Sequence, residues 1–283
     1  MLISVAVVPG PPAFVAELMG SAAHELDDLR RAADSAVSRA VFDLVAASAD
    51  SVVAASADSV VAASADSVVA ASADSPSSDS VSAQLVIVGP GPAGEFNAAG
   101  PVSFDSFGRD VVVPALIKGE QTDRELPTPL MVARYLASRD VAAHPEHADL
   151  WASARWITTS GAGATTLGKQ LREDGTRVGL ILVADGAACH GPKAPRAEDS
   201  RALAYDDGVC AALGSGQPGR LAQLDVDLGH ELGATGPQVW PVLIAAAGID
   251  GIGEVLWRGA PYGVGWAVAA WRRPPTSAAA APA

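Results

Sequence analysis

The sequence predicts an α/β fold, with one domain built on a central parallel or mixed sheet and helices on both faces. Short apolar runs rich in β-branched residues alternate with longer segments of helical periodicity through most of the chain. The run RVGLILVA at 177–184 is bulky and continuous, as in a strand that is covered on both faces. We expect the domain to span residues 1–272 of the 283.

The first predicted elements are a strand over Leu2–Val8 and a long helix, or two helices in line, from Val15 to Leu44. The octapeptide VAASADSV then begins at 45, 53 and 61, and at 69 with proline as its last residue. At about 100° per residue, each copy places its valines about 80° round a helix from the previous copy, so no apolar stripe persists. We therefore expect residues 46–82 to be a weakly helical or disordered insertion within the domain.

The second half of the chain continues the alternation of strands and helices. Strands are predicted from Leu85 and over 110–116, 154–158, 177–184, 254–258 and 264–270. Helices are predicted over 128–138, 165–173, 201–213, 218–231 and 237–247, the first with Thr128 as N-cap and Pro129 in its first turn. Residues 273–283 are expected to be a disordered tail.

The stretch LVIVGPGPAG at 85–94 fits the G-x-G-x-x-G spacing of a dinucleotide-binding turn. That turn needs a helix after it, because the N-terminus of the helix binds the pyrophosphate. The residues that follow, EFNAAGPVSFDSFGRD, have no helical apolar repeat. A strand that ends in a glycine-proline loop is the favoured interpretation, and a flavin or nicotinamide enzyme is kept as an alternative.

Charge and composition narrow the partners that we expect. A formal net charge of −13, with no dense cluster of Lys and Arg, disfavours nucleic acid. No window reaches the roughly 18 uninterrupted apolar residues of a membrane helix. The N-terminus lacks the basic region of a signal peptide, and two cysteines are too few for a disulfide framework. These features predict a cytoplasmic protein with no membrane partner; oligomeric state stays open.

Several segments together resemble one enzyme family. They are LISVAVVPGPPAFVAEL, LVIVGPGPAG, LILVADGAACHGPKAPR, YDDGVCAALGSG, QVWPVLIAAAG and EVLWRGAPYGVGWAVA. They are similar to the class III extradiol ring-cleavage dioxygenases, in particular to the type of catalytic subunit found in protocatechuate 4,5-dioxygenase and to an actinobacterial branch of proteins related to that subunit. The resemblance implies a class III extradiol dioxygenase-like α/β fold.

The resemblance also indicates where iron is held in active members of that family. Two histidines and one glutamate hold Fe(II) and leave open positions for a catechol-type substrate and oxygen. This chain has Pro9-Gly-Pro-Pro12 and Gly89-Pro-Gly-Pro92 at the two histidine positions, and Gln238 near the glutamate position. The resemblance therefore implies a family member without the iron triad, with no metal and no confident cofactor. Gly89, Gly91 and Gln238 are expected to line its ligand cleft.

One functional position of the family is matched by the turn Gly186-Ala-Ala-Cys-His190. The family has an acid–base histidine at the end of a G-x-x-S-H-like turn, so His190 is the candidate general acid or base. The equal alternative is a structural histidine that bonds a backbone carbonyl. Asp185 and Lys193 are nearby candidates for catalysis, and Tyr262, just before the last strand, is a candidate for the same cleft.

The favoured function is therefore small-ligand binding, for example of an aromatic compound, or a non-oxidative activity near His190. The first alternative is an active metal-dependent extradiol dioxygenase that cleaves catechol-type diols. It would bind Fe(II) through His24, or through His144 and His147 of a tract that we expect to be an exposed loop. A non-catalytic interaction protein is the remaining alternative.

Overall fold

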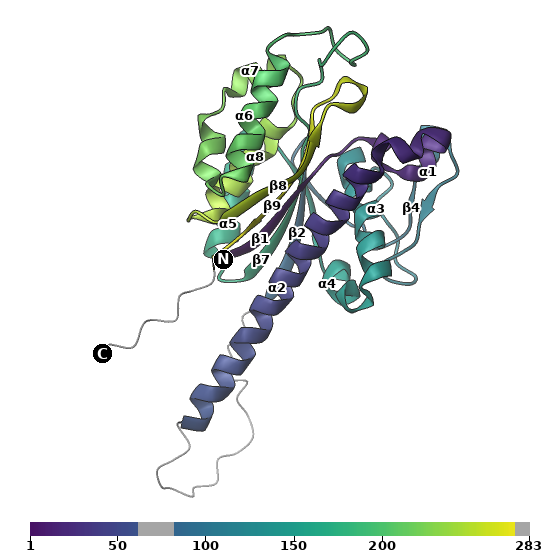
Figure 1. Ribbon diagram of the computed structural model, residues 1–283. Coiled ribbons are helices and arrows are strands. Elements are labelled where there is room, and N and C mark those ends of the chain that lie inside the picture. The colour runs from purple at the N-terminus through teal and green to yellow at the C-terminus, as the bar shows by residue number, and fades with distance from the viewer. Residues whose placement is uncertain (62–81, 275–283) are drawn as a thin grey trace, which may run out of the picture.

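The computed structural model describes residues 1–61 and 82–274, and of residues 50–61 it describes the backbone only (Figure 1). Its centre is a mixed sheet of seven strands in the order β3-β6-β2-β7-β1-β9-β8. Strands β6, β2, β7 and β1 are parallel, and β3, β9 and β8 run antiparallel to their neighbours. The prediction of an α/β fold with a central mixed sheet is confirmed. The strands are β1 Leu2–Val8, β2 Ala83–Pro90, β3 Gly94–Phe96, β6 Arg155–Thr159, β7 Arg177–Val183, β8 Ile252–Gly259 and β9 Trp266–Arg272.

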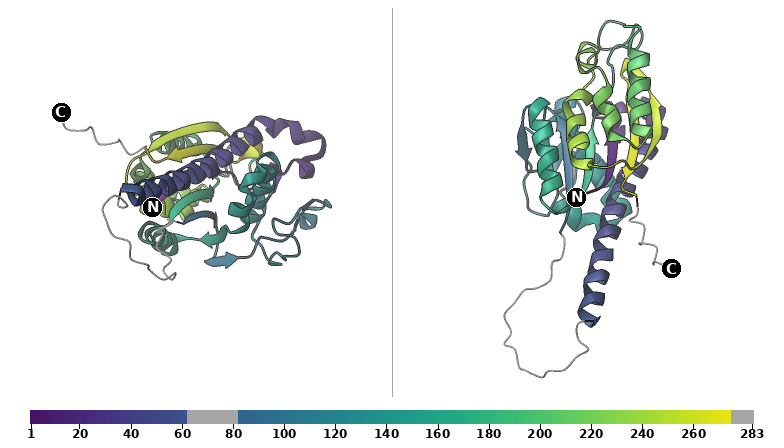
Figure 2. Two further views of the ribbon diagram at one scale, coloured as in Figure 1. Left: turned by 90° about the horizontal axis from the view of Figure 1, so that it is seen from below. Right: turned by 90° about the vertical axis from the view of Figure 1, so that its left-hand side faces the viewer.

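Helices cover both faces of the sheet, as the two further views show (Figure 2). One face packs against α2 (Asp27–Val61), α3 (Thr128–Ala143) and α4 (Ala148–Ala152). The other packs against α5 (Gly161–Glu173), α6 (Ala202–Gly214) and α8 (Gly236–Ala247). Because side chains alternate across a strand, Leu85 and Ile87 of β2 enter the first core, while Val86 and Val88 enter the second. This explains why the central strands are apolar throughout.

The helix predicted from Val15 is interrupted before its long part begins. A 3₁₀ turn (Pro12–Phe14), the short helix α1 (Ala16–Met19) and a second 3₁₀ segment (Gly20–Leu26) precede α2. Gly20 has a φ of 56°, which breaks the helical path. The predicted apolar stripe then packs on the sheet, since Leu29, Val37 and Leu44 are buried. The backbone of α2 continues to Val61, so residues 46–61 of the predicted insertion are helical. Residues 62–81 of that insertion lie outside the described residues.

Two predicted elements differ from the structure in extent. The strand expected over 110–116 is only β5 (Val112–Val113), which pairs with β4 (Val102–Ser103) in a separate small sheet. The helix expected over 218–231 is a 3₁₀ segment (Pro218–Gln223) followed by α7 (Val226–Glu231). The break occurs because Leu224 and Asp225 are extended, and the Asp225 side chain caps α7 by accepting the N–H of Leu228 at 2.9 Å.

The ends of two other segments also need correction. The N-cap of α3 is Pro127, not Thr128, because Thr128 and Pro129 already belong to the helix. The tail predicted from residue 273 begins later, since the Arg273 N–H donates to the carbonyl of Ile3 at 2.8 Å and its side chain donates to Leu2 at 2.8 Å. Residues 275–283 lie outside the described residues.

Short 3₁₀ segments complete the described fold at Asp105–Phe107, Pro145–His147 and Pro261–Gly263. Among the helices of the described residues, none is long and apolar enough to cross a membrane.

Candidate functional site

The loop after β7 meets the loop after β1 at the carboxyl ends of these parallel strands. The Gly10 N–H donates to Asp185 Oδ1 at 3.1 Å. The backbone of Asp185 is also tied to the start of α8, because its N–H donates to Thr235 Oγ1 at 2.8 Å and its carbonyl accepts the N–H of Thr235 at 3.0 Å. Asp185 is therefore fixed between two loops and a helix, as expected for a side chain at a ligand-binding edge of the sheet.

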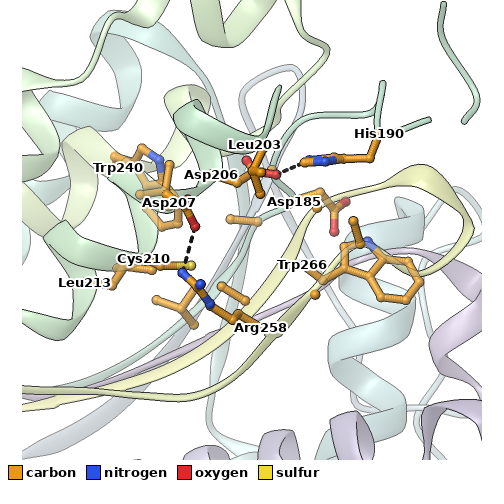
Figure 3. Close-up of a pocket in the computed structure, with 18 residues that line it drawn as sticks. Asp185, His190, Leu203, Asp206, Asp207, Cys210, Leu213, Trp240, Arg258 and Trp266 are labelled. Carbon is orange, nitrogen blue, oxygen red and sulfur yellow. Dashed lines mark hydrogen bonds and ion pairs between the residues drawn. The ribbon is translucent and has the colours of Figure 1, made fainter. Parts of the chain in front are cut away.

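A cavity of about 230 Å³ opens beside Asp185 (Figure 3). Its walls come from the loop after β7, from α6, from the first turns of α8 and from the adjoining ends of β8 and β9. Most of the wall is apolar, with Val7, Leu203, Val209, Leu213, Trp240 and Trp266 as the large members. An apolar cavity of about 150 Å³ is enough to hold benzene, so this one has room for a single-ring molecule.

His190 and Asp206, which we call the dyad, lie together in the wall of this dyad cavity. The His190 Nε2 is 2.6 Å from Asp206 Oδ2, and Asp206 Oδ1 accepts the N–H of Ala187 at 3.0 Å. The two side chains are 15% and 17% exposed. Among the residues that the structure describes, His190 Nδ1 has no hydrogen-bond partner. The pair thus has one nitrogen oriented by a carboxylate and one whose hydrogen-bonding capacity is unused among the described residues.

Backbone hydrogen bonds and two glycines hold the dyad in place. The Gly186 N–H donates to the Gly265 carbonyl at 2.7 Å, and the Gly265 N–H donates to Ala187 at 2.7 Å. A Cβ at Gly186 or Gly265 would overlap the Asp206 carboxylate, so the carboxylate fits only because both residues are glycine. The His190 N–H donates to the carbonyl of Gly263 at 3.0 Å. The loop after β7 is therefore bonded to the segment before β9, and the dyad forms where the two meet.

Burial raises the pKa of two carboxyl groups in the cavity wall, those of Asp206 and Asp185. It raises the pKa of Asp206, while the hydrogen bonds from Ala187 and His190 act in the opposite direction. It raises the pKa of Asp185 to about 6, and the bond from Gly10 opposes this only in part. A carboxyl group with a pKa near neutrality, close to a histidine, is typical of sites that transfer protons.

An ion pair and two cysteines lie in or near the wall of the cavity. The Arg258 Nη1 forms an exposed ion pair with Asp207 Oδ1 at 2.8 Å. Cys210 lines the cavity, but burial raises the pKa of its thiol, which disfavours the nucleophilic thiolate. Cys189 is buried and donates to the carbonyl of Leu232 at 3.5 Å. Neither cysteine has the environment of a catalytic nucleophile.

Two of the predicted catalytic residues, His190 and Asp185, line the dyad cavity, and the third does not. Lys193 is exposed in the loop beyond His190 and is not part of the wall. Tyr262 is also outside the wall and 41% exposed, with its hydroxyl donating to Glu25 at 2.7 Å. Its ring meets that of Trp266 edge-on, with 6.4 Å between centroids, so Tyr262 contacts a residue of the wall without lining the cavity.

The other predicted cleft residues lie away from this cavity. Gly89, at the end of β2, is not part of the cavity wall and packs against α3, where a Cβ at this glycine would lie 3.0 Å from the Pro129 Cβ. Gly91 packs near Thr158, and Gln238 is in the first turn of α8 outside the wall. Their role in ligand binding stays a prediction.

Asp206 is the candidate functional residue that the sequence did not reveal. It lies in α6 within the motif YDDG, 16 positions after His190. The only signal was the pair of aspartates near the start of a helix, which is more often a solvated helical face.

The sites considered for Fe(II) do not form a metal centre. His24 is exposed, and its Nδ1 is 2.9 Å from the carbonyl of Ser21. The prediction of an exposed loop at 144–147 is wrong for His147, which is buried with its Nδ1 2.8 Å from Asp140 Oδ2. Asp140 also accepts the indole N–H of Trp151 at 2.8 Å, so a structural network fills this region.

Among the residues whose side chains the structure describes, 1–49 and 82–274, no group of three or more His, Cys, Asp or Glu is placed to hold a metal ion. The residues at 9–12 and 89–92, together with Gln238, supply no imidazole or carboxylate and do not fit a triad of two histidines and one carboxylate for Fe(II).

The dinucleotide alternative also lacks its structural context. After Gly89-Pro-Gly-Pro-Ala-Gly94 the chain enters strand β3, as expected from the absence of helical periodicity. Between these glycines and α3, the described residues form no α-helix whose N-terminus could bind a pyrophosphate.

The chain matches no protein-family model and no curated protein.

Proposed function

We propose that this protein binds a small organic molecule in the dyad cavity and that His190, oriented by Asp206, exchanges a proton with it. The observation that carries the proposal is the 2.6 Å contact between His190 Nε2 and Asp206 Oδ2 in the wall of a largely apolar cavity. A histidine with one nitrogen bonded to a carboxylate is oriented for proton transfer through the other.

The cavity wall supplies the groups that proton transfer by His190 requires. Asp206 fixes the imidazole and stabilises the imidazolium that forms when Nδ1 takes a proton. The apolar wall, including Trp240 and Trp266, excludes water and strengthens the electrostatic interactions inside. Asp185 is a second carboxyl group, with a pKa of about 6, that can hold or release a proton near neutral pH.

As part of this proposal, the protein is a class III extradiol dioxygenase-like protein that lacks the iron triad and carries out a non-oxidative activity. Two observations support this assignment: the α/β sheet and the placement of the Gly186–His190 turn directly after β7, with His190 in a cavity. The alternative, ring cleavage of catechols with Fe(II), finds no set of suitable ligands among the described residues.

Binding and proton transfer can be measured with resorcinol, a single-ring diol. Because Trp240 and Trp266 line the cavity, a bound ring changes tryptophan fluorescence, and saturation at one site per chain is expected. In D₂O, transfer of protons through His190 exchanges ring hydrogens of resorcinol for deuterium, which proton NMR follows. His190→Ala should abolish the exchange, and Asp206→Asn should slow it by about 10²-fold, within the usual contribution of a general acid or base.

His24→Ala is the matched control, because His24 is an exposed histidine outside the cavity. It should exchange deuterium at the wild-type rate. Equal rates for His190→Ala and wild type would refute the role of His190. In a separate experiment, the protein is loaded with Fe(II) under anaerobic conditions and then exposed to air with catechol. Oxygen uptake in that experiment would instead favour the dioxygenase alternative.

A further inference from the structure

The charges in the wall of the dyad cavity favour one sign of ligand. Three carboxyl groups line the cavity, those of Asp185, Asp206 and Asp207, against the single guanidinium of Arg258. Asp207 is compensated by Arg258 at 2.8 Å, and Asp206 is bonded to His190. Asp185 has no cationic partner among the described residues, and its only side-chain hydrogen bond is the one from Gly10.

An uncompensated carboxylate in an apolar wall is unfavourable, because desolvation penalises the charged form. Burial accordingly raises the pKa of Asp185. Figure 3 shows its carboxyl group between His190 of the dyad and Trp266, and Asp185 is one of the residues that line the cavity. A cation bound there would restore the balance of charge, whereas an anion would add to the excess of negative charge.

A second observation concerns the two tryptophans of the same wall. The indole N–H groups of Trp240 and Trp266 have no partner in the described part of the chain, although the two side chains are only 5% and 3% exposed. Buried donors normally have an acceptor. The two nitrogen atoms are themselves inaccessible, so these donors do not face the ligand; the tryptophan side chains lie on opposite sides of the cavity and offer it apolar ring surface (Figure 3).

We infer that the ligand of the dyad cavity is a small organic cation, a protonated primary amine on a single-ring body. Its ammonium group pairs with Asp185, and its ring lies between Trp240 and Trp266. This inference rests on the proposed function, because it assumes that the cavity binds a ligand, and it adds the charge and chemical class of that ligand.

Three probes with the same phenol ring test the inference: tyramine is a cation, 4-(2-hydroxyethyl)phenol is neutral and 3-(4-hydroxyphenyl)propionate is an anion. In calorimetric titrations of the full chain near pH 7.5, where Asp185 is ionised, tyramine should bind about tenfold more tightly than the neutral probe. The anion should bind most weakly.

Asp185→Asn should weaken the binding of tyramine about tenfold and leave the neutral probe within roughly twofold of wild type. Asp227→Asn, which changes an exposed aspartate of α7 outside the cavity, is the matched control and should bind all three as wild type does.

Equal or tighter binding of the neutral or anionic probe would overturn the inference, as would an Asp185→Asn variant that binds tyramine unchanged. Absence of binding by all three would overturn it as well. If resorcinol still binds and exchanges deuterium in that case, the proposed function survives and only the preference for a cation is lost.

Discussion

Replacing Asp185 by asparagine should stabilise the protein at neutral pH, although it removes a candidate functional group. Burial raises the pKa of Asp185 from 3.8 to about 6 in the folded state. Between these values the folded state binds the proton more tightly than the unfolded state, so the free energy of unfolding falls as the pH rises. A shift of about two units corresponds to about 3 kcal/mol, all of it lost above pH 6.

Asparagine does not ionise and can still accept the Gly10 N–H through its amide oxygen. Urea unfolding, followed by circular dichroism, should therefore show Asp185→Asn to be more stable than wild type by about 2–3 kcal/mol at pH 7.5. At pH 4, where the wild-type carboxyl is protonated when folded, the two should differ by less than about 1 kcal/mol. A variant less stable than wild type at pH 7.5, or a difference that does not depend on pH, would refute the reasoning.

Two further predictions concern contacts that hold the fold and the dyad. Gly265→Ala places a Cβ onto the Asp206 carboxylate of the dyad, so it should abolish deuterium exchange into resorcinol and lower the melting temperature. Gly219→Ala is the control, because a Cβ there would meet no other atom, and it should change neither the exchange nor the melting temperature. His147→Ala leaves the buried Asp140 without its imidazole partner and should cost about 3 kcal/mol in urea unfolding. His144→Ala, at a half-buried residue whose side chain makes no hydrogen bond to Asp140, should cost less than about 0.5 kcal/mol. Equal losses for the two histidine variants would contradict the assigned network.

The strands were the most predictable elements, because local pattern and burial agree in them. In β1 and β7 the continuous apolar runs are buried on both faces, as their sequences indicate. The apolar stripe from Leu29 to Leu44 likewise packs on the sheet. Short elements such as β5 were less predictable, since two residues carry too little periodicity to separate a strand from a loop.

Only part of the candidate site could be predicted. Asp185 and His190 follow a clear strand, and the carboxyl ends of parallel strands are where ligands bind. Asp206 could not be assigned, because its contact with His190 depends on glycines at 186 and 265 and on hydrogen bonds between distant loops. The wall formed by β8 and β9 also depends on the order of strands in the sheet, which periodicity does not determine.

The most direct test is a ¹⁵N NMR titration that follows the indole N–H signals of the six tryptophans as ligand is added. If the dyad cavity is the ligand site, saturating resorcinol shifts the signals of Trp240 and Trp266, which line it. The signals of Trp151 and Trp271, which are bonded to Asp140 and Gly216 outside the cavity, stay in place. Unmoved signals for Trp240 and Trp266, or shifts confined to Trp151 and Trp271, would contradict the account.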